Sequence, residues 1–413
     1  MIRKPGLIVA FLSLFAIAFH SGAFAAAGSL DPTFGNRGKV LTSLHNCGTA
    51  ICIADPIGAF LQPDGNIVVG VRSAASVLRY LNNGSLDPNF GSNGVALVPK
   101  ALGAEAAIIL QEDGKIVVAG ENAVTNGTAV TVARLNSNGT LDANFGSDGI
   151  AAATLNGAGR GLGEAVLIQP DNAILVAATV SKPIRPVTSV TALARFNPNG
   201  SPDTSFGNGG AEIITGATSG VRTTAVLQDG EILVVNGSAI AQFTSNGTLE
   251  PNVTGGTIVA TSNNEVFLSN GNFLHATTVS TGSLSSEAQV LEFTHTGAKD
   301  SAFNNPMFGF VSDGFNQGDS TGLQADGKIV VGGARFAPDS SSSVDGLARL
   351  NTDGSMDSSF GNDGTLTTSF TNHDLGYDFI LIQNDGSIVA IGASEDRANL
   401  EQDDVALARY LAE

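Results

Sequence analysis

The sequence predicts an all-β protein, a seven-bladed β-propeller built from seven four-stranded repeats of about 55 residues. An eleven-residue motif recurs seven times, each copy is accompanied by four short apolar runs, and a tight turn stands at the same place in each repeat. Self-similarity at such a period is typical of folds in which each unit buries its apolar surface against its neighbours. The copies begin at Gly28, Gly84, Gly139, Gly200, Gly247, Gly297 and Gly354.

The motif reads GSLDPNFGSNG at Gly84, and the first four copies and the last match it well. The fifth copy has Glu250 for the Asp, with Val253 and Thr254 for the Phe-Gly pair, and the sixth has Asn304 for the Gly. We expect these two units to be distorted. The chain resembles the delta-60 repeat family, bacterial β-propeller-like proteins with tandem LDxxFGxxG units, from Gly28 to the C-terminus. The resemblance implies a repeat architecture and no particular activity.

The apolar runs of each repeat predict four strands of about five residues. In the second unit they are VALVP, AAIILQ, KIVVAG and VTVARLN. An Asp-Gly dipeptide separates the second run from the third, and it is the strongest short hairpin signal because a type I′ turn needs positive φ at both central residues. It recurs, with two variants, at Asp64-Gly65, Asp113-Gly114, Asp171-Asn172, Asp229-Gly230, Asn270-Gly271, Asp326-Gly327 and Asp385-Gly386.

A closed ring is favoured over an open solenoid. An open solenoid needs polar capping units at its ends, whereas the first and last units here match the consensus well. Radially arranged four-stranded sheets also protect nearly all strand edges.

Two residues that recur in most copies of the motif, an Asp and a Phe, are interpreted as structural. The Asp at its fourth position is expected to accept an N–H two residues on as an Asx-turn, and the Phe three residues later to be a wedge between adjacent blades. The pairs are Asp31 and Phe34, Asp87 and Phe90, Asp142 and Phe145, Asp203 and Phe206, Asp300 and Phe303, and Asp357 and Phe360. In an alternative, these carboxylates and Glu250 line one mouth of the ring and hold a hard cation such as Ca²⁺. No other cofactor is predicted.

Residues 1–25 have the pattern of a secretory signal peptide, with Arg3 and Lys4 before an apolar run and Ala-Phe-Ala before a cut after Ala25. Residues 26–413 are then the propeller domain. We expect a monomer in the periplasm or outside the cell, with no membrane span in the mature chain. The formal net charge of −18 disfavours nucleic acid as a partner.

Cys47 and Cys52 are the only cysteines, and in an exported chain they predict a disulfide. With His45 they also make H-x-C-x₄-C, which offers three ligands for Zn²⁺ or copper. The string Gly318-Asp319-Ser320-Thr321-Gly322 matches the G-x-S-x-G nucleophile elbow. We interpret it as part of a repeat, because a repeat hairpin rather than a helix follows it.

In an up-and-down blade the Asp-Gly turns and the motifs share one face, and the variable loops share the other. Binding sites of repeat proteins often lie where loops vary, so we expect a protein or glycan ligand on the variable face, over residues 42–56, 153–163, 181–189, 337–345 and 394–404. The predicted function is a non-catalytic binding or scaffold propeller. The alternative is a hydrolase or lyase with carboxylates at the channel mouth, which requires a cluster of acidic residues there.

Overall fold

The computed structural model describes residues 26–412, apart from residues 45–53, 73–75, 100–103, 125–126, 157, 160, 183–187, 215–222, 228, 237–238, 253–257, 262–265, 283–284, 311–314, 337–342, 371–372 and 397–402. The predicted signal peptide lies outside the described residues, and so do His45, Cys47 and Cys52. The cleavage site and the disulfide therefore stay predictions.

The described residues form twenty-eight strands and no helix, grouped as seven four-stranded antiparallel units that we call blades 1 to 7. Blades 5 and 6 are joined into one eight-stranded sheet by a single parallel pairing of Ser286 with Phe315. Blade 1 comprises β2 (Pro56–Leu61), β3 (Ile67–Val71), β4 (Ser76–Tyr80) and β5 (Val95–Leu97); blade 2 comprises β6 (Ala104–Leu110), β7 (Ile116–Val124), β8 (Gly127–Leu135) and β9 (Ile150–Asn156); blade 3 comprises β10 (Gly161–Ile168), β11 (Ile174–Lys182), β12 (Thr188–Phe196) and β13 (Ala211–Ile214). Blade 4 comprises β14 (Thr223–Leu227), β15 (Ile232–Asn236), β16 (Ala239–Phe243) and β17 (Ile258–Thr261); blade 5 comprises β18 (Val266–Phe267), β19 (Phe273–Gly282), β20 (Ser285–Phe293) and β21 (Met307–Phe308). Blade 6 comprises β22 (Phe315–Leu323), β23 (Ile329–Phe336), β24 (Ser343–Leu350) and β25 (Thr365–Thr368); blade 7 comprises β26 (His373–Ile382), β27 (Ile388–Asp396), β28 (Asp403–Tyr410) and β1 (Lys39–Ser43).

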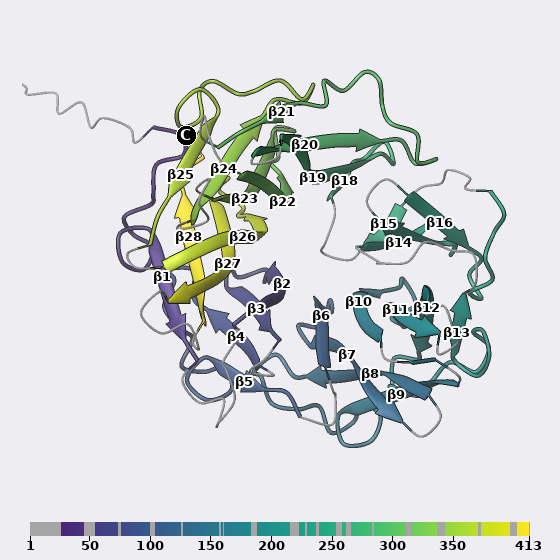
Figure 1. Ribbon diagram of the computed structural model, residues 1–413. Coiled ribbons are helices and arrows are strands. Elements are labelled where there is room, and N and C mark those ends of the chain that lie inside the picture. The colour runs from purple at the N-terminus through teal and green to yellow at the C-terminus, as the bar shows by residue number, and fades with distance from the viewer. Residues whose placement is uncertain are drawn as a thin grey trace, which may run out of the picture.

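The blades stand around a central axis as a seven-bladed β-propeller (Figure 1), which confirms the predicted fold class. In the regular blades the strand that precedes the hairpin turn is innermost, and the strand that follows the motif is outermost. The ring closes because β1, near the N-terminus, pairs antiparallel with β28, near the C-terminus. Each blade thus takes its outer strand from the motif that follows its third strand.

Several strands are longer than the apolar runs suggested. In blade 2, β7 and β8 each run nine residues, and their pairing continues from Ile116 opposite Leu135 to Val124 opposite Gly127. In β7 the residues past the apolar run become exposed at Ala123 and Val124, whereas β8 is buried from Thr128 to Leu135. The hydrogen-bonded ladder continues past the apolar run, because each further backbone pair is satisfied by its partner strand.

Blade 4 departs from the regular order, as its motif departs from the consensus. Its strand β17 pairs with the inner strand β14, not with β16, so the sheet order is β16-β15-β14-β17. In blade 5 the inner strand β18 and the outer strand β21 have two residues each. A separate apolar cluster lies at this joint, where Phe273 stacks on Phe293 with ring centroids 5.2 Å apart.

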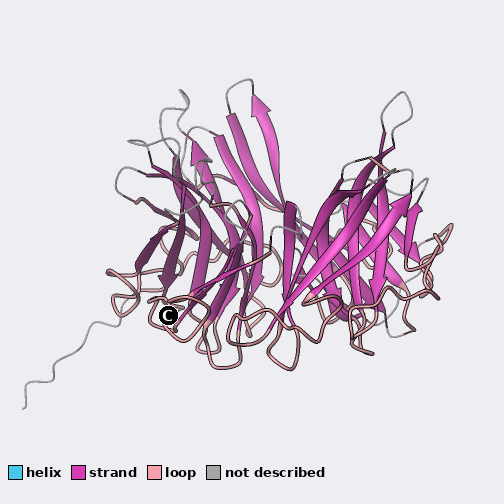
Figure 2. Ribbon diagram, turned by 90° about the horizontal axis from the view of Figure 1, so that it is seen from below, coloured by secondary structure: helices cyan, strands magenta, loops and turns pink. Residues whose placement is uncertain are grey.

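The two ends of the strands form two distinct faces. Consecutive strands of a blade are antiparallel, so the Asp-Gly turn and the motif lie at one end, which we call the motif face. The connections from the second strand to the third, and from the outer strand to the next blade, lie at the other end, which we call the variable face. Figure 2 shows the turns and motif loops gathered along one edge of the ring, opposite the variable face.

Candidate functional site: the motif face and the channel mouth

The motif Asp side chains bind within their own repeats. In six units Oδ1 accepts the N–H two residues on over 2.8–3.1 Å, an Asx-turn. In five units Oδ2 also accepts from the Nε of an Arg in the preceding strand over 2.6–2.9 Å. Burial alone would raise the pKa of Asp142, but the N–H of Asn144 and the guanidinium of Arg134 outweigh it and hold that pKa below its ordinary value.

The same arginines join neighbouring blades. Each donates from an Nη to a backbone carbonyl of the next repeat, over 2.5–3.0 Å, and lies over the ring of its motif Phe with Cζ 4.4–5.2 Å from the centroid. The residues are Arg79, Arg134, Arg195, Arg349 and Arg409. In the two irregular repeats this position is Gln242 or Glu292, so the irregular motifs also lack their arginine.

The motif Phe packs between blades. A Cβ added to the first Gly of the next motif would come within 2.7–3.1 Å of the Phe ring at six junctions, so only Gly allows this contact. Gly84 covers Phe34 in this way, and Gly28 covers Phe360, which closes the circle between the last motif and the first. At the remaining junction Gly297 faces Ile240, because its preceding motif has Val253 in place of Phe.

The G-x-S-x-G string lies in the inner strand β22. Ser320 is buried, and its Oγ donates to the backbone carbonyl of Tyr377 in the next blade over 3.2 Å. A buried hydroxyl within a strand lacks the exposed strand-to-helix turn of a nucleophile elbow.

A β-bulge recurs in the inner strands of five blades. The unpaired residues are Ile57, Ala106, Glu164, Asp319 and Asp378. Each stands seven residues before the Asp of its hairpin turn. Bulges re-aim a side chain and are common next to active sites. Asp319 and Asp378 are exposed, whereas the residues next to them in the strands, Gly318, Ser320 and Tyr377, are buried.

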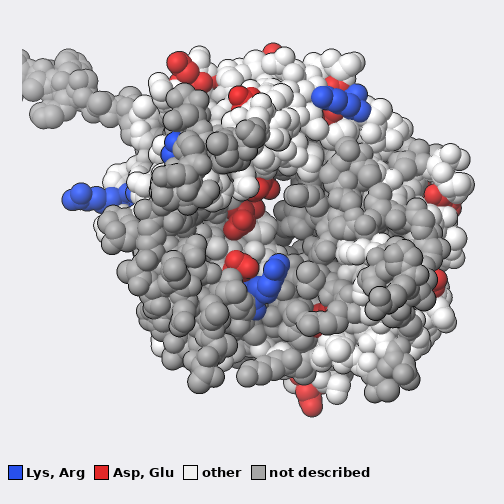
Figure 3. Space-filling view, in the orientation of Figure 1, with Lys and Arg blue, Asp and Glu red and all other residues white. Residues whose placement is uncertain are grey.

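Charged side chains from three neighbouring blades meet at the channel. Asp55 precedes β2, Arg72 follows β3, Asp319 belongs to β22 and Asp378 to β26. Arg72 Nη1 lies 4.0 Å from Asp55 Oδ2, and the Arg72 N–H donates to the Asp55 carbonyl over 3.0 Å. Figure 3, in the orientation of Figure 1, shows a hollow at the centre of the ring with acidic and basic side chains at its edge. This cluster was the feature that the enzyme hypothesis required.

Two neighbouring carboxylates affect the protonation of Asp378. Asp378 is reached by water through the channel, yet protein surrounds it. This burial, with the charges of Asp319 and Asp55, raises the pKa of Asp378 to about 7, against the lowering effects of the Ala393 backbone and Arg72. Asp378 therefore exchanges a proton near neutral pH, as general acids and bases do.

A buried polar chain lies behind Asp378, between blades 6 and 7. The hydroxyls of Tyr377 and Tyr410 are 2.6 Å apart, and Tyr410 donates to Thr368 Oγ1 over 2.6 Å. Asp345 has no exposed surface, and neither of its carboxylate oxygens has a hydrogen bond of normal geometry. Burial raises the pKa of Asp345 well above its ordinary value, and the charge of Asp378 adds to this, although nearby Tyr377 and Lys39 act in the opposite direction. A neutral carboxylic acid is favoured there.

Within the described part of the chain, no group of three or more His, Cys, Asp or Glu side chains is placed to hold a metal ion. Nor does any described helix have the length and apolar character needed to cross a membrane.

Sequence reasoning placed the motif Asp and Phe but missed the Arg partner and the channel carboxylates. The arginine was visible as the shared R of LRYL, ARLN, ARFN and ARYL. Asp319 and Asp378 shared only a fixed distance to the hairpin turn. That spacing does not show by itself that a bulge turns the side chains of Asp319 and Asp378 outward.

A family model described as a β-propeller domain of unknown function, DUF5122, matches residues 62–90, 111–145, 169–206 and 324–360. No curated protein matches the sequence.

Three solved structures are similar over most of this chain. They are a streptogramin B lyase (11% identity, 89% of this chain and 96% of that one, TM-score 0.48), the extracellular domain of a one-component-system protein from B. thetaiotaomicron (12%, 91% and 40%, 0.41), and a PQQ-bound aldose sugar dehydrogenase from Streptomyces coelicolor (10%, 90% and 98%, 0.37). These likenesses say nothing of this chain's ligand. The four matched segments and the seven blades make the chain a β-propeller repeat protein.

Proposed function

We propose that this chain is an exported member of the delta-60 repeat family that binds a partner on its variable face without changing it chemically. The charged cluster supports this proposal most strongly, since Asp55, Asp319 and Asp378 come from three neighbouring blades and lie close enough to interact electrostatically. The tandem LDxxFGxxG units support the family, and the pattern of residues 1–25 supports export.

The cluster suits a ligand that presents a positive charge or several hydrogen-bond donors. Ionised carboxylates accept hydrogen bonds only, and Asp55 and Asp319 supply such acceptors. Arg72 neutralises part of their charge and can orient an acceptor of the ligand. A cationic side chain of a protein partner, or the hydroxyls of a glycan, meet these requirements.

The test captures partners from the native cell envelope with the wild type and with a D319N/D378N variant. Both substituted residues are exposed in the channel, so the fold should be preserved. A D326N variant on the motif face is the matched control, since Asp326 is exposed there in a hairpin turn. We expect the channel variant to lose the partner and the control to keep it. Equal capture by all three proteins would refute the channel as the binding site.

One observation favours a second candidate function, a hydrolase or lyase. Asp378, with a pKa of about 7, lies beside two carboxylates with which it interacts electrostatically, and such an arrangement suits general acid–base catalysis. If the captured ligand is a substrate, wild-type protein will convert it to a product of different mass. D378N should then bind the ligand and leave its mass unchanged. A ligand that stays intact with the wild type supports binding alone.

A further inference from the structure

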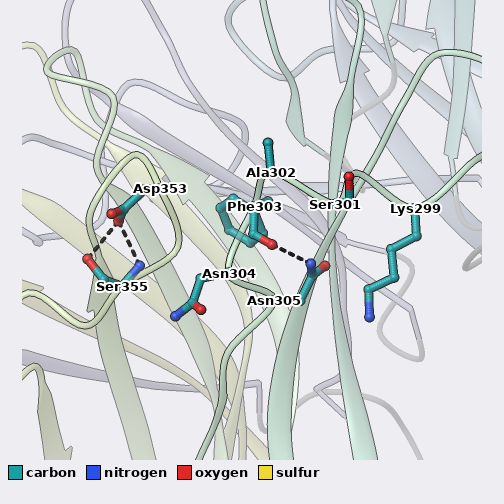
Figure 4. Close-up of a pocket in the computed structure, with 8 residues that line it drawn as sticks. All are labelled: Lys299, Ser301, Ala302, Phe303, Asn304, Asn305, Asp353 and Ser355. Carbon is teal, nitrogen blue, oxygen red and sulfur yellow. Dashed lines mark hydrogen bonds between the residues drawn. The ribbon is translucent and has the colours of Figure 1, made fainter.

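A polar pocket lies on the motif face, between the sixth motif and the start of the seventh, and has a volume of about 740 Å³. Its lining includes Lys299, Ser301, Asn304, Asn305, Asp353 and Ser355 (Figure 4). The volume is within the range of roughly 300–1,000 Å³ that is usual for small-molecule sites. The pocket is on the face opposite the channel cluster, so it is independent of the proposed function.

Three lining residues replace the residue that the repeat normally has there. Lys299 stands where four other motifs have Leu, Asn304 where five have Gly, and Asp353 where four have Asn. All three changes introduce a larger, charged or more polar side chain around one pocket. Random decay of a repeat would not be expected to concentrate them there.

The loss of the leucine has a local cause. In regular motifs the Leu packs over the last Gly of the same motif, as Leu141 does over Gly149, where an added Cβ would lie 2.3 Å from the Leu141 side chain. The sixth motif has Met307 at that glycine position. Its side chain excludes the regular packing, and the exposed Lys299 takes the place of the leucine.

Opposite charges stand at opposite ends of the pocket. Figure 4 shows Lys299 at one end and Asp353 at the other, with the amides of Asn304 and Asn305 between them. Asp353 Oδ1 accepts from the Ser355 N–H over 2.9 Å and from its hydroxyl over 2.6 Å. These hydrogen bonds from Ser355 hold the pKa of Asp353 below its ordinary value, so the carboxylate is charged at neutral pH.

Asn305 holds the turn that lines the pocket. Its Nδ2 donates to the Phe303 carbonyl over 2.5 Å and to the Asp300 carbonyl over 3.2 Å. Its Oδ1 is buried with almost no accessible surface, so a ligand in the pocket cannot reach this oxygen.

We propose that this pocket binds a short peptide with free termini. The peptide carboxylate lies at Lys299 and its ammonium group at Asp353. The Asn304 amide can hydrogen-bond a peptide carbonyl or N–H, since it has both donors and an acceptor. The separation of the two charges makes the zwitterion the complementary ligand. A purely anionic ligand would be repelled by Asp353, and a neutral sugar would use neither charge fully.

The test measures binding of the wild-type protein to trialanine by ligand-observed NMR, with dialanine and tetra-alanine to determine the preferred length. N-acetyl-trialanine amide has the same backbone without either charge and should bind much more weakly. K299L and D353N restore the residues of other repeats and are therefore compatible with the fold. Each should weaken trialanine binding about threefold to fivefold, as expected for an exposed charge contact, whereas K299R should retain it.

The D319N/D378N channel variant serves as a control and should bind trialanine like the wild type. The proposal is overturned if trialanine fails to bind at millimolar concentrations, if the blocked peptide binds equally well, or if K299L and D353N bind unchanged. Stronger binding of maltotriose than of every peptide would assign the pocket to sugars instead and would equally overturn it.

Discussion

Arg409 Nε donates a hydrogen bond to Asp31 Oδ2 over 2.9 Å, although 378 residues of sequence separate the two. The same contact joins Arg79 to Asp87 within one repeat, eight residues apart. The pair thus repeats an ordinary local contact, but at the junction of the two ends of the chain. It acts with the β1–β28 pairing to hold the ring closed.

Arg409→Ala should destabilise the fold by about 3–5 kcal/mol, because it leaves the buried Asp31 carboxylate without its partner. Arg79→Ala removes the same local contacts and is the matched control. Only R409A should speed amide hydrogen exchange in residues 39–43, since only its partner belongs to the N-terminal segment. Equal exchange of β1 in both variants would show that strand pairing alone closes the ring.

Acid should destabilise the protein through the motif Asp residues. Their pKa values are lowered in the fold, so the stability they contribute is present above the unfolded pKa of about 3.9 and is lost as pH falls below it. Asp142→Asn keeps the turn acceptor and removes the charge, at a cost of about 3 kcal/mol near pH 6 because Arg134 loses its partner. Urea unfolding measured from pH 6 to pH 2 should show that the difference in unfolding free energy between the wild type and the variant becomes smaller. A difference that stays constant would show that ionised Asp142 does not stabilise the fold.

Because neighbouring motifs pack closely, substitution of Gly200 should destabilise the fold more than substitution of Gly209. Both have positive φ, but a Cβ at Gly200 would lie 2.6 Å from the Gly146 nitrogen, whereas nothing lies within 4 Å at Gly209. Gly209→Ala should cost about 1–2 kcal/mol of backbone strain. Gly200→Ala should cost about 1–3 kcal/mol more, from overpacking. Similar melting temperatures for the two variants would contradict the inter-blade role of the first glycine.

Asp345→Asn should make the protein relatively more stable as pH rises. Because the folded pKa of Asp345 is raised, the wild type is most favoured at low pH and loses stability as pH climbs above about 3.9, where the unfolded chain ionises. Asn has the same shape and does not titrate. The melting temperature of the variant relative to wild type should increase steadily from pH 4 to 8. A difference that is independent of pH would show that Asp345 is ionised in the fold.

Binding of a cationic partner in the channel should strengthen as pH rises through about 7, where Asp378 gains its negative charge. Since a single charge is involved, the change in affinity should be about tenfold or less. The dissociation constant of the captured partner can be measured by titration at pH 5.5 to 8.5. Asp378→Asn should make this constant independent of pH in that range. A profile that D378N leaves unaltered would assign the pH dependence to another group.

The number of repeats, their hairpins and the local positions of Asp and Phe in the motif could be predicted from the sequence. These features are local: a turn needs particular residues at adjacent positions, and a strand shows its buried side by alternation. Asp87 could be assigned an Asx-turn because its acceptor and donor are two residues apart.

The groups that meet from different blades are set by the assembly of the ring and could not be predicted from the sequence. The inward pairing of β17, the completion of blade 7 by β1, and the convergence of Asp55, Asp319 and Asp378 depend on strand register and on bulges. A one-residue slip turns a side chain from one face of a sheet to the other, so no local pattern specifies it. Asp378 and Ala106 occupy equivalent bulge positions, yet only the assembled ring shows that the first stands among other carboxylates.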